Sequence, residues 1–116
     1  MQIQVNTDDN IEGRDELAHQ IEAAVNATLS RFSDQITRVE VHLSDEDAGK
    51  SGSPDKRCLM EARPAGRLPI AVSHKGATLE EAYSGAAKRL RSSLESTLGR
   101  ASDHKGVASI RTDGAM

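Results

Sequence analysis

The alternation of apolar and polar positions changes period along the chain, and each change marks a different element. Residues 2–6 (Gln-Ile-Gln-Val-Asn) alternate polar and apolar side chains, which is typical of a half-buried strand. From Asp15 the apolar residues instead recur every three or four positions as far as Phe32. This spacing gathers them on one side of a helix, so we expect a helix that packs one face on a core, with Asp15 in its first turn and Arg31 in its last.

The middle of the chain predicts three more strands, each with one face toward the core. Residues 37–44 and 57–63 alternate apolar and polar side chains, and a polar loop over 45–55 separates them. A short turn then joins the second of these runs to a strand at 68–72, so the last two strands form a hairpin. Pro69 has no backbone N–H, which indicates an edge strand or the first residues of a strand. The side chains expected to face inward here are Leu68, Ile70 and Val72.

A second helical stripe follows the hairpin. Apolar residues recur at helical spacing over 79–98, Thr78 is placed to cap the first turn, and Gly99 is placed to end the helix. The predicted order is β-α-β-β-β-α, an α+β two-layer sandwich with two helices on one face of a four-stranded sheet. We therefore expect one folded domain over residues 1–100 and a flexible C-terminal tail over 101–116.

Charge is distributed unevenly, although its total is small. The chain has 15 Lys and Arg against 18 Asp and Glu, a formal net charge of −3. Residues 1–34 contain two basic and seven acidic side chains, whereas residues 88–100 contain four basic side chains and one acidic side chain. Contact with a polyanion is therefore expected only in this late stretch. An alternative stays open, in which the Lys and Arg side chains only solvate the end of a helix, where the helix dipole favours them.

The side chains show no catalytic or metal-binding pattern. Gly49-Lys50-Ser51 resembles the end of a phosphate-binding loop, but the first glycine of that motif is missing. The four histidines lie on separate predicted elements without metal-ligand spacing, and His74 is the one nearest the expected core. Cys58 is one of the alternate residues of a predicted strand that face the core, where a small buried hydrophobic residue is expected. We therefore predict a protein that is not an enzyme and has no cofactor, metal or small-molecule substrate.

The sequence also indicates the compartment. Its longest apolar runs are a few residues, far below the roughly 20 that a transmembrane helix needs. The first residues lack the basic and apolar regions of a signal peptide. A single cysteine forms no internal disulfide, which fits a reducing environment. We expect a cytoplasmic protein that does not associate with a membrane.

Five segments resemble a known family. They are the opening strand at 3–5, the Leu-Ser-Arg-Phe that closes the first helix at 29–32, the strand at 36–44 that ends in Leu-Ser, the acidic-aromatic helix entry at 78–83, and the basic run at 88–94. Together they resemble the bacterial ribosome hibernation-promoting factor and ribosome-associated inhibitor A family, also called sigma-54 modulation proteins. The resemblance covers about residues 1–100.

The resemblance implies the partner and the effect on it. Members have a β-α-β-β-β-α domain that binds the 30S ribosomal subunit, on 16S rRNA in the channel used by mRNA and tRNA anticodon arms. There they block translation and stabilise idle ribosomes in stationary phase or under stress. Long members add a C-terminal dimerisation domain, and because sixteen residues follow Arg100, we expect a short form.

The expected rRNA contacts are basic side chains, because rRNA presents phosphates. The first helix departs from the Lys-rich pattern of the family, so fewer phosphate contacts and weaker binding are expected. A protein–protein interaction module on the same scaffold, with weak or no RNA binding, is the alternative. The resemblance implies contacts by Lys88, Arg89, Arg91, Arg100 and Arg31, to which we add the hairpin arginines Arg57, Arg63 and Arg67.

Overall fold

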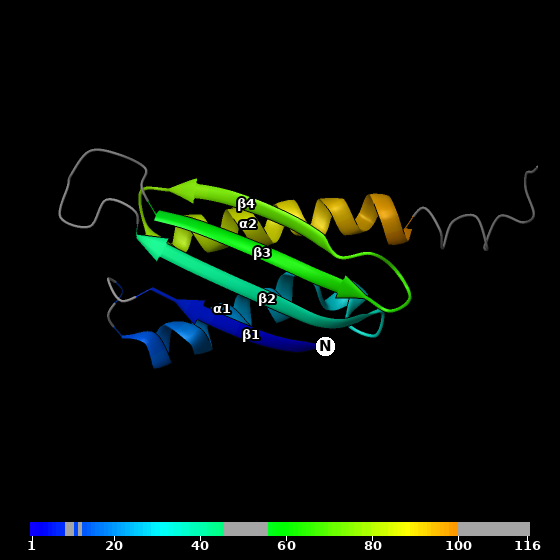
Figure 1. The fold of residues 1–116 in the computed structure, drawn as a ribbon, viewed down its shortest axis with the longest axis horizontal. Helices are drawn as coiled ribbons and strands as arrows, with labels where there is room; N and C mark the ends of the chain where they lie inside the picture. Colours follow the sequence, from blue (N-terminus) through cyan, green and yellow to red (C-terminus); the bar gives the residue numbers. More distant parts are fainter. Residues whose placement is uncertain (9–10, 12, 46–55, 100–116) are drawn as a thin grey trace, which may run out of the picture.

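The computed structural model describes residues 1–8, 11, 13–45 and 56–99 (Figure 1). The predicted loop at 46–55 and the predicted tail lie outside these residues. The elements are β1 (Gln2–Thr7), α1 (Arg14–Thr28), the 3₁₀ helix η1 (Ser30–Phe32), β2 (Ile36–Asp45), β3 (Lys56–Pro64), β4 (Ile70–Gly76), α2 (Leu79–Leu94) and the π-helical η2 (Glu95–Gly99). The predicted α+β order β-α-β-β-β-α is confirmed.

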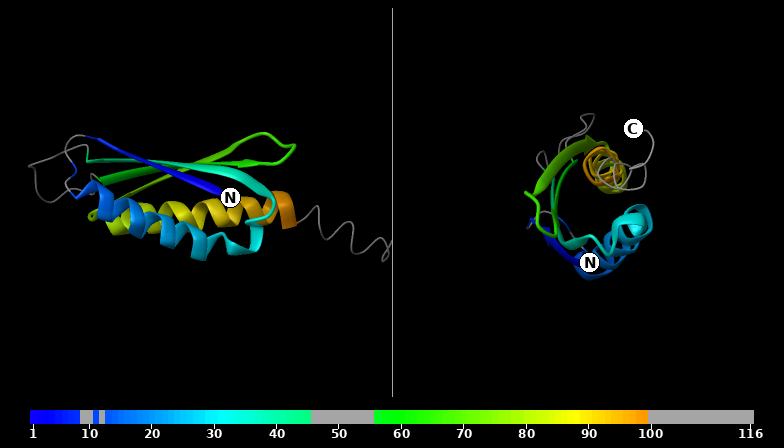
Figure 2. Two further views of the ribbon diagram at one scale, coloured as in Figure 1. Left: turned by 90° about the horizontal axis from the view of Figure 1, so that it is seen from below. Right: turned by 90° about the vertical axis from the view of Figure 1, so that its right-hand side faces the viewer.

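The four strands form one mixed sheet in the order β1-β2-β3-β4. The first two strands run parallel, with Val5 beside Val41, because α1 carries the chain back across the sheet between them. The other neighbours are antiparallel, and Val41 also lies beside Met60 on β3. Both helices cover the same face of the sheet, and no helix of the described residues lies on the opposite face (Figure 2).

The core lies between the sheet and the two helices. Alternate residues of each strand point into it, so the strands bury one face, as a period of two requires. Each large aliphatic side chain buried in this way contributes about 1.5–3 kcal/mol of transfer free energy. The fully buried large side chains include Val39, Val41, Leu43 and Met60 from the sheet, and Ile21, Val25, Leu90 and Leu94 from the helices.

The first helix ends earlier than its apolar spacing predicts. It stops at Thr28, Leu29 follows as its C-cap, and residues 30–32 form the separate 3₁₀ turn η1. Arg31 therefore does not lie in the last turn of α1, and that expectation is wrong. The apolar period continues through the break because Leu29 and Phe32 both remain buried. In a 3₁₀ turn, residues three positions apart lie on the same side, and in an α-helix they lie nearly so. Leu29 and Phe32 are three positions apart, so both still face the core.

The inward assignment of Leu68 is also wrong. This side chain is 85% exposed and precedes β4, which begins at Ile70. The turn before it contains Gly66 at a φ of +72°, and Pro69 has no N–H to donate to a ladder. Pairing with β3 therefore starts only after the proline, and β4 is an edge strand as Pro69 indicates.

The second helix begins as its sequence predicts. Thr78 is the N-cap, and its side-chain oxygen accepts a hydrogen bond of 3.1 Å from the backbone N–H of Glu81. The Glu81 carboxylate in turn accepts from the N–H of Ala77 at 3.0 Å. The first bond satisfies a backbone donor that a helix start otherwise leaves unpaired, and the second ties the residue before the N-cap to the first turn. They fix where α2 begins and hence which of its side chains face outward.

Candidate nucleic-acid interface

Three predicted contact residues lie on the outward side of α2. A helix turns by about 100° per residue, so Lys88 points directly away from the buried stripe while Arg89 and Arg91 point to either side of it. All three are exposed, and the stripe opposite them is buried. We call these three residues, together with Arg31 on η1, the α2 basic strip.

Arg31 and Arg91 meet at one carboxylate, although they lie on different elements. Glu95 at the start of η2 is 3.7 Å from Nη1 of Arg31 and 3.8 Å from Nε of Arg91. Arg31 also lies over the ring of Phe32, 5.3 Å from its centroid. One carboxylate between two guanidinium groups leaves a surplus positive charge there. Exposed ion pairs of this kind contribute only about 0–1 kcal/mol each, so the arginines are not locked.

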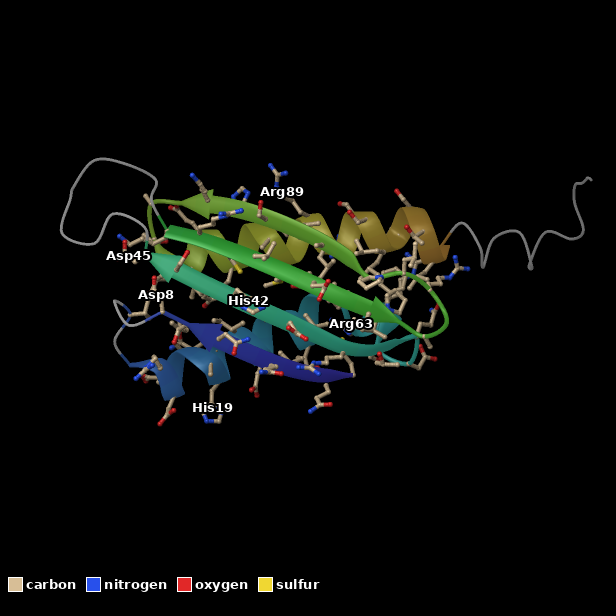
Figure 3. The ribbon with its side chains drawn as sticks, viewed as in Figure 1. Asp8, His19, His42, Asp45, Arg63 and Arg89 are labelled. Atoms are coloured by element: carbon tan, nitrogen blue, oxygen red, sulfur yellow. The ribbon has the colours of Figure 1, made fainter. Side chains whose placement is uncertain are left out.

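Arg89 lies at the other margin of the strip, where α2 borders β4 (Figure 3). Its Nε–H donates a hydrogen bond of 3.2 Å to Nδ1 of His74, the last but two residue of that strand. Within the described residues, Arg89 has no carboxylate partner of its own. Its positive charge is therefore not neutralised by an ion pair there.

The hairpin arginines are not next to the outward side of α2. Arg57 and Arg63 project from the face of the sheet opposite the helices, since they alternate with the buried residues of β3. Arg63 pairs with Glu61 at 3.4 Å and reaches Glu40 at 4.0 Å. Arg67 lies in the exposed β3–β4 turn. Arg100 lies outside the described residues.

Charge is separated along the length of the helices. Both helices start at the end of the sheet where β1 and β2 finish, and both run toward the β3–β4 turn (Figure 1). Their first turns carry acidic pairs, Asp15 and Glu16 on α1 and Glu80 and Glu81 on α2. Arg31 and Arg91 come together at the other end. Along the helices, the acidic pairs thus lie at one end, and two arginines that share one carboxylate lie at the other.

Comparison with protein families identifies the relatives of this arrangement. The family model for "Sigma 54 modulation protein / S30EA ribosomal protein" matches residues 3–102. The chain belongs to this family. The resemblance inferred from its sequence segments is therefore confirmed.

Solved structures agree with the S30EA family assignment. The N-terminal domain of protein Y from Thermus thermophilus is 26% identical, with a TM-score of 0.66; the match covers 84% of this chain and 99% of that one. A ribosomal subunit interface protein from Coxiella burnetii is 12% identical with a TM-score of 0.60, covering 85% of this chain and 99% of the other. At that identity the second likeness supports the fold alone. A comparison with curated protein sequences gave no match.

Cys58 lies beside a histidine in the sheet, because it is the register partner of His74. The thiol is fully buried, and burial raises its pKa to about 12. At pH 8 only about one such thiol in 10⁴ is ionised. Since the thiolate is the reactive form, Cys58 is a packing residue and not a nucleophile.

This assignment predicts slow chemical labelling. We expect iodoacetamide at pH 8 to modify Cys58 in the folded protein at least about 100-fold more slowly than in urea, where the thiol is hydrated and ionises normally. Mass spectrometry of timed samples measures both rates. Equal rates in the two conditions would show that the thiol is accessible and reactive in the native state.

Within the part of the chain that the structure describes, His, Cys, Asp and Glu side chains form no group of three that could hold a metal ion. None of the described helices is both long and apolar enough to cross a bilayer. The Gly49-Lys50-Ser51 segment lies outside the described residues.

Two residues that were not predicted as part of the site contact the arginines of the α2 basic strip. Glu95 lies four positions after Arg91, and this spacing on a helix is a signal that sequence reasoning can use. His74 comes from a different element, fifteen positions before Arg89. No local spacing links these two, so only the packing of α2 on β4 shows the contact.

Proposed function

We propose that this S30EA family member is a non-catalytic, cytoplasmic factor that binds 16S rRNA of the 30S subunit near the mRNA and tRNA channel. Bound there, it inhibits translation under stress or in stationary phase. Membership of a family described as an S30EA ribosomal protein supports the ribosome as the partner. The α2 basic strip supports rRNA as the component contacted, because phosphates attract lysine and arginine.

The observation that carries the proposal is the separation of charge along the helices. A net charge of −3 argues against binding a polyanion with the whole surface. The acidic pairs lie in the first helical turns, however, while Arg31 and Arg91 share a single carboxylate at the other end. Phosphates therefore approach one end of the molecule favourably, and this also orients the protein on the subunit.

The predicted contact residues outside the α2 basic strip differ in where they lie relative to it. Arg67 lies in the turn toward which both helices run, so we include it in the proposed surface (Figure 1). Arg63 lies near that turn as well, although Glu40 and Glu61 partly neutralise it. Arg57 lies at the opposite end of β3, beside Lys75 of β4, and would meet rRNA only if the uncovered sheet face also makes contact. Arg100 remains a proposed contact because it follows η2 directly.

A salt series on purified 30S subunits tests the proposal. Four phosphate contacts predict a slope of about −3 in a plot of log affinity against log salt. We expect the affinity, measured by co-sedimentation, to fall roughly 50-fold between 50 and 200 mM KCl. Failure to sediment with 30S subunits even at low salt would contradict the proposal.

A protein–protein interaction module remains the second candidate, and one feature favours it. A cleft of about 350 Å³ opens on the uncovered face of the sheet, at the end of β1 and β2. Its lining includes Leu59, an apolar side chain that is 37% exposed, together with His42. Apolar contact is little affected by salt, so binding that persists unchanged to high ionic strength would favour this candidate over rRNA contact.

A further inference from the structure

The ring of His74 is held in a slot between β4 and α2. His74 lies in the helix-facing row of β4 with Ile70 and Val72, and it is half-buried. The slot exists because Gly85 of α2 has no side chain. A Cβ at residue 85 would lie 2.7 Å from Cγ of His74 and closer still to Cδ2 and Nε2. Such distances are not compatible with the present ring position, so the glycine and the histidine fit each other.

The same ring binds the guanidinium group one helical turn further on. Arg89 lies four positions after Gly85, and its Nε–H donates to Nδ1 of His74 at 3.2 Å. Because Nδ1 accepts, the proton of the neutral ring is on Nε2. The guanidinium group has five N–H donors, and this bond uses the one on Nε. The four N–H groups on the two Nη atoms stay available, and they can bind two oxygens of one phosphate.

We infer that His74 is a positioning residue for a phosphodiester-binding point at Arg89. The inference rests on the proposed function, in which the α2 basic strip meets rRNA phosphates. An exposed arginine without a partner samples many rotamers, and a bound phosphate has to restrict them. His74 favours one of them in advance, because its ring lies in the space that Gly85 leaves and its Nδ1 accepts the hydrogen bond from Nε of Arg89. Arg89 thus gains affinity for phosphate without any added charge.

A double-mutant cycle on 30S binding tests this coupling. We expect Arg89→Ala to weaken binding about 10-fold and His74→Leu about 3-fold or more, since an oriented charge-assisted contact is lost or loosened. In the Arg89→Ala background, His74→Leu should have almost no further effect. His74→Asn should restore binding to within about 2-fold of wild type, because its Oδ1 accepts from Arg89 at about the place of Nδ1.

Several outcomes would overturn the inference. If the effects of His74→Leu and Arg89→Ala on affinity are additive, His74 does not act through Arg89. If His74→Asn binds as weakly as His74→Leu, the accepted hydrogen bond is not what matters. Wild-type protein that fails to bind 30S subunits at any salt concentration overturns the proposed function instead, and the cycle then gives no difference at all.

A second measurement follows the contact without the ribosome. In ¹H–¹⁵N spectra of the free protein, the Nε–H signal of Arg89 should exchange slowly with water in wild type and in His74→Asn. It should exchange at the rate of an unbonded arginine in His74→Leu. Fast exchange in the wild type would show that the bond is not formed in solution, and the inference would be wrong whatever the affinities are.

Discussion

Reversing the charge of Lys88 and Arg91 to glutamate should lower the affinity for 30S subunits by about 100-fold or more at 100 mM salt. The double variant Lys88→Glu with Arg91→Glu removes two charge-assisted contacts, each worth about 1.5–3 kcal/mol, and places carboxylates where phosphates would lie. It should also reduce the slope of log affinity against log salt by about two. Co-sedimentation over a salt series measures both effects.

The control for this variant changes net charge equally on another surface. Arg14→Glu with Gln20→Glu and Ala23→Glu lowers the net charge by the same four units on the exposed side of α1. If the position of the charges matters, the control should keep most of the affinity, since exposed charges beyond about 10 Å are largely screened at this salt concentration. Equal losses in both variants would show that only total charge matters, and the α2 basic strip would not be the contact surface.

The fold was predictable because its signals are local and repeated. The period-two runs at 37–44 and 57–63 and the helical spacing at 79–98 each contain several apolar residues, and all of them lie within observed elements. The wrong predictions concern the ends of elements, where a single residue determines whether a helix or strand continues. Spacing alone does not show that the chain tightens after Thr28, nor that pairing in the hairpin waits until Pro69 has passed.

The candidate site was predictable only in part. A sequence window shows that basic residues are frequent in 88–100, and helical periodicity shows which of them point outward. It does not show that Arg31, sixty residues before Arg91, meets the same carboxylate. Nor does it show that Arg89 meets His74 where α2 borders β4. Neighbours that are distant in sequence depend on the packing of whole elements, which no local pattern contains.

Replacing Gly85 with alanine should destabilise the fold, although alanine is the better helix former. The added Cβ meets the ring of His74, so the ring or the helix has to move. Overpacking of this kind costs about 1–3 kcal/mol and exceeds the roughly 0.5–1 kcal/mol that alanine gains over glycine in a helix. Each kcal/mol corresponds to a fall in Tm of roughly 4–8 °C for a domain of this size, which thermal unfolding followed by circular dichroism measures.

The sign of the effect should reverse when the ring is removed. In a His74→Ala background the three atoms nearest to the added Cβ are gone, so Gly85→Ala should stabilise the protein by about 0.5–1 kcal/mol through helix propensity. Ser92→Ala, at an exposed position of the same helix, serves as the control and should change stability by no more than about 0.5 kcal/mol in either background. A Gly85→Ala effect of the same sign and size in both backgrounds would mean that His74 does not fill the space beside Gly85. Reversal would show that the position of the His74 ring, which brings its Nδ1 to Arg89, depends on this one missing side chain.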